Sequence, residues 1–293
     1  MRISLTVTNF SWPGGPAGLA ERLGRLARQA DEGGLDTLWL SDHLLQGEPG
    51  TDPNQEMLEA YTALGHLSAL TRRIRLGAMV SPVTFREPAL LVKAVTTLDV
   101  LSGGRAWLGL GAGYHLAEAE MMGLPLPPTA ERFDRMEETL QLAHRMWAGD
   151  DTAFEGVHYR ATRPLNSPPA LTRPRPPILV GGTGEKRTLP LVARYADACN
   201  VFDIPDGGAT VRHKLEVLAE CCAAVGRPYE RLEKTVSTRL GTDESAAAFA
   251  DRCGTLAALG IDHAVVLTSG PWTDDAVARL VQAVPAVRGV TNR

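Results

Sequence analysis

The sequence predicts an α/β protein built as a (β/α)8 TIM barrel. Eight short apolar or β-branched segments alternate with longer segments in which apolar residues recur at helical spacing. Parallel strands need a crossover between them, and eight strand–helix units close into a barrel. The length of 293 residues also suits one such barrel. An open doubly wound sheet is the alternative, but it usually has only about five or six strands.

The expected elements follow one another in regular alternation. The strands are residues 2–8, 36–40, 74–80, 105–110, 177–180, 198–202, 232–237 and 263–267. The helices are residues 19–30, 53–70, 89–101, 132–147, a segment that reaches residue 196, segments near 211–225 and 245–259, and a last one from residue 274. Gly33-Gly34 and Gly103-Gly104 are expected to end the first and third helices.

Residues 149–176 break the alternation after helix 4. They are rich in proline and glycine, and residues 154–159 are expected to form a hairpin. We interpret the segment as an insertion, because the same alternation resumes after it. Residues 1–293 are therefore expected to form a single domain.

Composition narrows the class of function. The net charge of −4 argues against binding to nucleic acid or to a membrane surface, because both favour a basic patch. No apolar run reaches the length of about 18 residues that a membrane span needs, and no secretory signal is recognisable, so we expect a cytoplasmic protein. The spacing of the four cysteines suits neither zinc nor a disulfide framework, so we expect free thiols and no metal site.

In barrel enzymes the active site lies at the carboxyl ends of the strands. The second strand ends in Ser41-Asp42-His43, and an imidazole changes its charge near neutral pH. His43 is therefore a candidate proton carrier. The alternative is that Ser41 or Asp42 only caps the next helix and that His43 is a surface residue.

Glycines follow three further strands. Small residues around Gly77 and Ala78 would let a flat ligand approach the backbone, or would simply form a loop before the next helix. Gly109–Gly113 would form a shelf without side chains, although Tyr114 stands where the dinucleotide fingerprint requires glycine.

Gly181–Gly184 would form an anion site where a helix opens, or a purely structural turn. Lys186 and Arg187 are expected in the first turn of that helix. Cations there oppose the helix dipole unless a phosphate binds. At the first strand end, Phe10 and Trp12 would contact substrate or cover the top of the barrel.

Several of these motifs together resemble one family. The chain resembles the luciferase-like flavin-dependent oxidoreductases, in the branch that uses the deazaflavin coenzyme F420. The resemblance covers residues 1 to about 270, and its motifs are GLDTLWLSDHL, RIRLGAMVSPVTFREPALLVKAVTTLDVLSGGRAWLGLGAGYH, ERFDRMEETLQLAHRMW, FEGVHY and PPILVGGTGEKRTLPLVARYADACNVF. These motifs are specific to the superfamily and less decisive about which flavin binds.

The resemblance implies a cofactor site in the mouth of the barrel. Asp42 and His43 would lie at the ring, and a non-proline cis peptide at Met79-Val80 would back it. The implied cofactor-binding residues are Asp42, His43, Met79, Val80, Ser81, Gly111, Ala112, Gly113, Tyr114, Gly181, Gly182, Thr183, Gly184 and Lys186. Some F420-dependent dehydrogenases of this family have Glu at the position of Tyr114. This departure argues against sugar-phosphate dehydrogenase activity.

The resulting hypothesis is an oxidoreductase that transfers a hydride between F420 and a small organic substrate. His43 would donate or accept the proton, Asp42 would orient the imidazole or cap the next helix, and Tyr114 would hydrogen-bond substrate or ring. The alternatives are an FMN-dependent monooxygenase on the same scaffold and a non-catalytic cofactor-binding or partner subunit. The substrate, expected to contact residues 44–60 and 149–176, is not readable from the sequence. We expect a homodimer.

Overall fold

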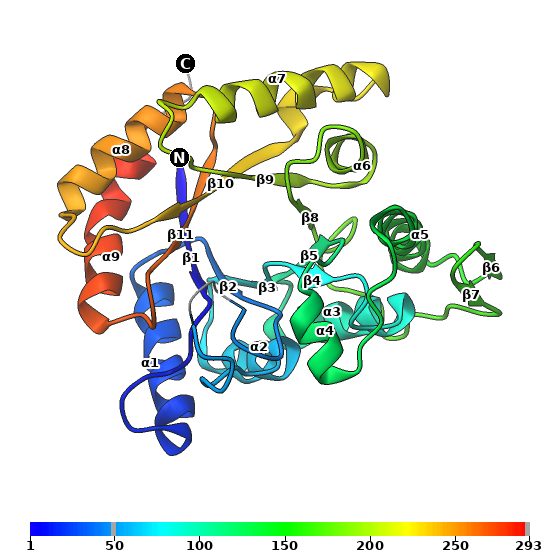
Figure 1. The fold of residues 1–293 in the computed structure, drawn as a ribbon, viewed down its shortest axis with the longest axis horizontal. Coiled ribbons are helices and arrows are strands. Elements are labelled where there is room, and N and C mark those ends of the chain that lie inside the picture. Colours follow the sequence, from blue (N-terminus) through cyan, green and yellow to red (C-terminus); the bar gives the residue numbers. More distant parts are fainter. Residues whose placement is uncertain (48–50, 291–293) are drawn as a thin grey trace.

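Eight parallel strands close into a barrel in the computed structural model, which describes residues 1–47 and 51–290 (Figure 1). The order around the barrel is β3-β2-β1-β11-β10-β9-β8-β5, and β3 pairs with β5 to close it. The strands are β1 (Arg2–Val7), β2 (Thr37–Leu40), β3 (Arg75–Ala78), β4 (Ser81–Pro82), β5 (Ala106–Gly111), β6 (Phe154–Glu155), β7 (Arg160–Ala161), β8 (Ile178–Gly181), β9 (Ala198–Phe202), β10 (Glu233–Arg239) and β11 (His263–Leu267). The predicted TIM barrel is confirmed.

Helices pack around the outside of the barrel (Figure 1). They are α1 (Leu19–Glu32), α2 (Ala60–Leu70), α3 (Pro88–Ser102), α4 (Leu116–Met122), α5 (Thr129–Ala148), α6 (Thr188–Tyr195), α7 (Ala209–Ala224), α8 (Ala246–Ala258) and α9 (Asp274–Arg288). Gly33 and Gly103 end α1 and α3 as expected, and Gly103 has a left-handed φ of 73°. In the described part of the chain, no helix is long and apolar enough to cross a bilayer.

The start of α2 and the presence of α4 differ from the prediction. The second helix was expected from residue 53 but begins at Ala60, where the Glu59 carboxylate accepts hydrogen bonds from the amides of Tyr61 and Thr62. Before it, Asp52 forms a local turn by accepting from the amide of Asn54. The short helix α4 was not expected. It lies between β5 and α5, and His115 caps it.

The insertion begins with the predicted hairpin, made by β6 and β7. It lies beyond α5, on the side away from the barrel (Figure 1). The Glu138 carboxylate of α5 accepts hydrogen bonds from the amides of Val157, His158 and Tyr159 and so fixes the hairpin turn. Residues 149–176, all of them described, are not among the residues that line the barrel cavity.

Two tryptophans lie in the interior of the barrel, in a buried cluster with Leu179, Ala198 and Val265. The rings of Trp39 and Trp107 lie 5.6 Å apart, centroid to centroid, and Arg75 covers Trp107 from the amino-terminal side at 4.7 Å. Gly77 lies between them on the neighbouring strand, where a Cβ atom would stand 2.7 Å from the Trp39 ring. Only glycine fits there. Phe10 and Trp12 are also buried core residues, and Trp12 donates to the carbonyl of Trp272.

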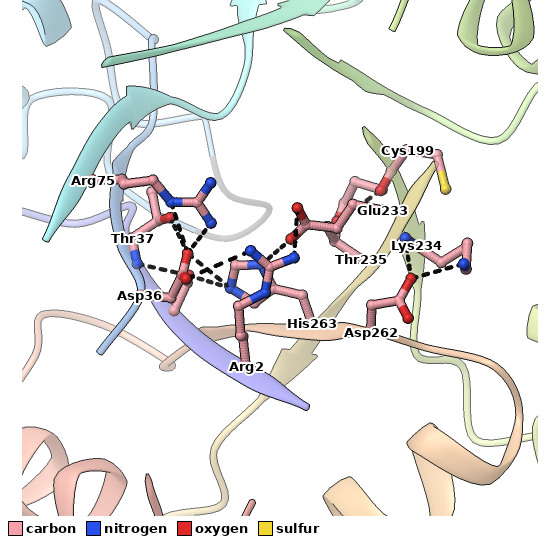
Figure 2. Close-up of polar contacts among 12 residues, drawn as sticks. Arg2, Asp36, Thr37, Arg75, Cys199, Glu233, Lys234, Thr235, Asp262 and His263 are labelled. Atoms are coloured by element: carbon pink, nitrogen blue, oxygen red, sulfur yellow. Dashed lines mark hydrogen bonds and ion pairs between the residues drawn. The ribbon is translucent and has the colours of Figure 1, made fainter. Parts of the chain in front are cut away.

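An ionic network closes the amino-terminal end of the barrel (Figure 2). Arg2 pairs with Glu233 at 2.7 Å, and Glu233 also binds Nδ1 of the buried His263 at 2.6 Å. Asp36 accepts hydrogen bonds from Arg75 and from the hydroxyl of Thr37. These contacts join five of the eight barrel strands or their immediate ends. Cys199, Cys222 and Cys253 are buried free thiols, and Cys221 is half-buried.

Candidate active site

A cavity of about 510 Å³ opens at the carboxyl ends of the strands. Its size is typical of small-molecule sites. Every barrel strand or the segment that follows it contributes to the wall, as in barrel enzymes generally. The wall includes one residue from each strand or the segment after it, taken here in the order β1, β2, β3, β5, β8, β9, β10 and β11: Thr6, His43, Met79, Gly111, Gly181, Asn200, Ser237 and Leu267.

Most of the predicted site residues meet at this cavity. Those in its wall are His43, Met79, Val80, Gly111, Ala112, Gly113, Tyr114, Gly181 and Gly182. Those outside the wall, in the described part of the chain, are Asp42, Ser81, Thr183, Gly184 and Lys186. From the expected 44–60 segment, Gln46, Gly47 and Met57 line the cavity, while residues 48–50 lie outside the described residues.

The peptide bond between Met79 and Val80 is cis, as the family resemblance implied. It separates β3 from β4, so the predicted strand over residues 74–80 ends early, at Ala78. Met79 and Val80 pack on the buried cluster that contains Trp39 and Trp107 and form a wall of the cavity.

The glycines of β5 and β8 make room for Val80. A Cβ atom at Gly111 would lie 2.7 Å from one Val80 methyl group, and a Cβ atom at Gly181 would lie 2.9 Å from the other. The sequence predicted a shelf without side chains at Gly109–Gly113 and an anion site or a structural turn at Gly181–Gly184. In the structure, Gly111 and Gly181 admit the side chain of Val80, which lies in the cavity wall.

Asp42 faces away from the cavity and is almost fully buried. One carboxylate oxygen accepts hydrogen bonds from Ser81 and Arg86, both at 2.6 Å, and the other accepts from Arg86 at 3.0 Å. Ser81 is also hydrogen-bonded to the hydroxyl of Tyr61 at 3.0 Å. Asp42 therefore neither orients the imidazole of His43 nor caps a helix, and both expected roles are wrong. It anchors the segment that carries Val80.

His43 lies in the cavity wall and has a different acidic partner. Its Nδ1 is 2.7 Å from Oε2 of Glu118, and its Nε2 is 3.4 Å from the hydroxyl of Tyr114. The rings of Tyr114 and His115 pack edge-on against the imidazole, with centroids 5.8 and 5.9 Å away.

Glu118 is buried in the first turn of α4, with 1% of its side chain exposed. Its second oxygen accepts hydrogen bonds from the amides of Leu44 and Leu45, at 2.6 and 3.2 Å. Burial raises the pKa of Glu118, but the hydrogen bonds from His43 and from these amides outweigh it, so the pKa lies below its ordinary value. Glu118 therefore carries a negative charge at neutral pH.

Sequence reasoning missed Glu118. The family pattern points to Tyr114, immediately after the β5 glycines, and does not point to the residues beyond it. The available signal was an acidic residue four positions further on, at the start of the segment that becomes α4.

The basic residues near Gly184 also differ from expectation. The helix α6 begins at Thr188 with Arg187 as its N-cap residue, so Lys186 and Arg187 lie just before the helix and not in its first turn. Arg187 pairs with Asp134, and Lys186 is exposed. Glu185 instead binds His213 and Lys214.

The cavity wall combines an apolar surface with a few polar groups. Val80 and Met79 provide an apolar wall, and the carboxyl ends of the strands provide polar groups such as Asn200 and Ser237. The charged groups in the described wall are Glu118, Arg239 and, when protonated, His43 and His115. This combination of an apolar wall and few polar groups is typical of cofactor sites.

The chain matches known proteins over most of its length. The family model for luciferase-like monooxygenases matches residues 1–281. An F420-dependent glucose-6-phosphate dehydrogenase from Kineococcus radiotolerans is 32% identical over 235 residues, which cover 77% of this chain and 65% of that protein. One from Nakamurella multipartita is 35% identical over 237 residues, which cover 78% of this chain and 65% of that protein. The matched part thus spans just under two thirds of these relatives.

A solved structure shares the fold. An F420-dependent secondary alcohol dehydrogenase in complex with an F420-acetone adduct superposes with a TM-score of 0.84. The superposition covers 98% of this chain and 99% of that protein, at 16% sequence identity. Fold, cavity position and family match agree: the chain belongs to the luciferase-like monooxygenase family.

Proposed function

We propose that the protein is an F420-dependent oxidoreductase that transfers a hydride between F420 and a small organic substrate held in the cavity. The observation that carries the proposal is the position of His43, in the cavity wall with Nδ1 bound to a buried carboxylate. The curated relatives named as F420-dependent dehydrogenases support the choice of cofactor.

The apolar wall of Met79 and Val80 would hold the ring, and the segment Gly111–Gly113 would lie beside it. When bound, F420 supplies a carbon that accepts or gives a hydride. In the direction of oxidation, His43 takes the proton of the substrate hydroxyl at Nε2. The charge of Glu118 stabilises the imidazolium that forms. In the reverse direction, His43 returns the proton to the carbonyl oxygen.

The substrate is a neutral alcohol or carbonyl compound in this proposal. A buried phosphate needs several cations or charge-assisted hydrogen bonds. Among the described residues that line the cavity, Arg239 is the one Lys or Arg. The presence of Tyr114, in place of the acid found in some family members, also favours a neutral substrate over a sugar phosphate.

Two measurements test the proposal. Fluorescence titration compares the binding of F420 and FMN, and tighter binding of FMN would overturn the choice of cofactor in favour of a monooxygenase. The loss of the visible absorbance of F420 is then followed with 2-propanol, cyclohexanol and glucose 6-phosphate. We expect reduction with a neutral alcohol. Faster reduction with glucose 6-phosphate would contradict the proposed substrate class, and bound F420 without turnover of any member of a broad panel would favour a non-catalytic subunit.

A further inference from the structure

The contact between His43 and Glu118 determines where the imidazole carries its hydrogen. An ionised carboxylate only accepts hydrogen bonds, and Oε2 of Glu118 lies 2.7 Å from Nδ1. The neutral imidazole must therefore hold its hydrogen on Nδ1. Nε2 is then left with a lone pair and lies 3.4 Å from the Tyr114 hydroxyl, at the edge of hydrogen-bond range.

Glu118 is held firmly enough to impose this choice. Its other oxygen accepts from the amides of Leu44 and Leu45, the two residues that follow His43 in the chain. The backbone amide of Glu118 donates a hydrogen bond to Nδ1 of His115, the residue that caps α4. One carboxylate thus fixes both the imidazole and the loop that carries it. It is also buried, so water does not compete for its oxygens.

We propose that Glu118 is a positioning residue that fixes the tautomer of His43, so that Nε2 can accept a proton from the substrate. The proposal rests on the proposed function. During oxidation the substrate O–H bond breaks and its proton goes to Nε2, while the hydride leaves the adjacent carbon for F420 and the C=O bond forms. Glu118 stays ionised throughout and balances the imidazolium charge.

The substitution Glu118→Gln gives a sharp test, because glutamine has one oxygen and one NH₂ group. The oxygen can still accept from Leu44 and Leu45, which places the NH₂ group at Nδ1 of His43. An NH₂ group donates, so the imidazole must move its hydrogen to Nε2. The wrong tautomer produced in this way costs about 10⁴ in rate in serine proteases.

The tautomer is read by ¹⁵N NMR on histidine-labelled protein without cofactor, at a pH where the imidazole is neutral. We expect hydrogen on Nδ1 in the wild type and on Nε2 in Glu118→Gln. Glu120→Gln is the matched control, since Glu120 is an exposed residue of the same helix. It should keep the wild-type tautomer. Hydrogen on Nε2 in the wild type, or no change in Glu118→Gln, would overturn the proposal.

Kinetics provide the second readout. With the alcohol that reduces F420 best, we expect kcat of Glu118→Gln to fall by about 10²–10⁴-fold, while the Kd of F420 and the melting temperature stay close to wild type. Unchanged kcat would overturn the proposal, and so would a loss confined to stability or to F420 binding. Failure of the wild type to bind F420 would instead refute the proposed function, and the NMR result would still stand.

Discussion

The carboxylate of Asp42 accepts three hydrogen bonds, two of them from the guanidinium of Arg86, on the side of the strand end that faces away from the cavity. His43, the next residue, lies in the cavity wall. Adjacent residues of an extended segment point in opposite directions. Asp42 thus holds the scaffold, while the imidazole of His43 faces the cavity.

Asp42→Asn is expected to destabilise the protein by about 3–5 kcal/mol, because it removes one partner of a buried ion pair. The change should appear in the midpoint of urea unfolding. Asp134→Asn breaks the exposed pair with Arg187 and serves as the control. It should shift the midpoint little. Equal effects of the two substitutions would contradict the anchoring role of Asp42.

His43→Ala is expected to lower kcat by about 10²–10⁴-fold while F420 still binds, because only the proton carrier is lost. Fluorescence titration and steady-state kinetics measure the two quantities separately. His66→Ala, which removes an exposed imidazole on α2, should leave both unchanged. A His43→Ala protein that binds F420 and keeps full turnover would remove His43 from the chemistry.

Gly111→Ala is expected to cost about 1–3 kcal/mol, because its methyl group would overlap Val80. The double substitution with Val80→Ala removes the overlapping methyl groups and should recover most of this loss. Urea unfolding measures both. Gly65→Ala is the control in α2, where nothing lies within 4 Å, and should stabilise slightly. If Val80→Ala gives no recovery, the glycine has another role.

The amino-terminal network predicts how stability depends on acid. Burial raises the pKa of Asp36, but the charges of His263 and Arg75 and the hydrogen bonds from Arg75 and Thr37 lower it to about 2. The folded pKa is below the unfolded value of 3.8, so this contribution is complete above that pH and is lost as pH falls towards 2. It amounts to about 2 kcal/mol. Urea unfolding between these pH values should show a smaller pH dependence for Asp36→Asn, and an unchanged slope would contradict the assignment.

The sequence was sufficient for features that repeat locally. The barrel was predictable because each strand is a short apolar run followed by a helical pattern, and the cis peptide at Met79-Val80 followed from the family resemblance. Contacts between distant segments were not predictable. Glu118 is 75 residues from His43, and Arg86 is 44 residues from Asp42. Nothing in the local sequence around Glu118 or Arg86 shows which strand end its side chain will face.

The glycines show the same limit more subtly. A glycine-rich strand end indicates close approach, but it does not indicate what approaches. At Gly111 and Gly181 the answer is Val80, which lies between β3 and β4. Similarly, α2 begins only after Glu59, whose carboxylate caps it, and the sequence of residues 53–58 does not reveal this contact.

The tryptophan pair in the barrel interior separates the amino-terminal ionic network from the cavity wall. Trp107 meets Arg75 of the amino-terminal network on one side, and the cluster of Trp39 and Trp107 supports Met79 and Val80 of the cavity wall on the other. Substitutions among the charged residues of the amino-terminal network are therefore expected to change stability without altering the geometry around His43. In evolutionary terms, this barrel can adapt its stability to a new temperature or pH at one end while substrate preference changes independently at the other.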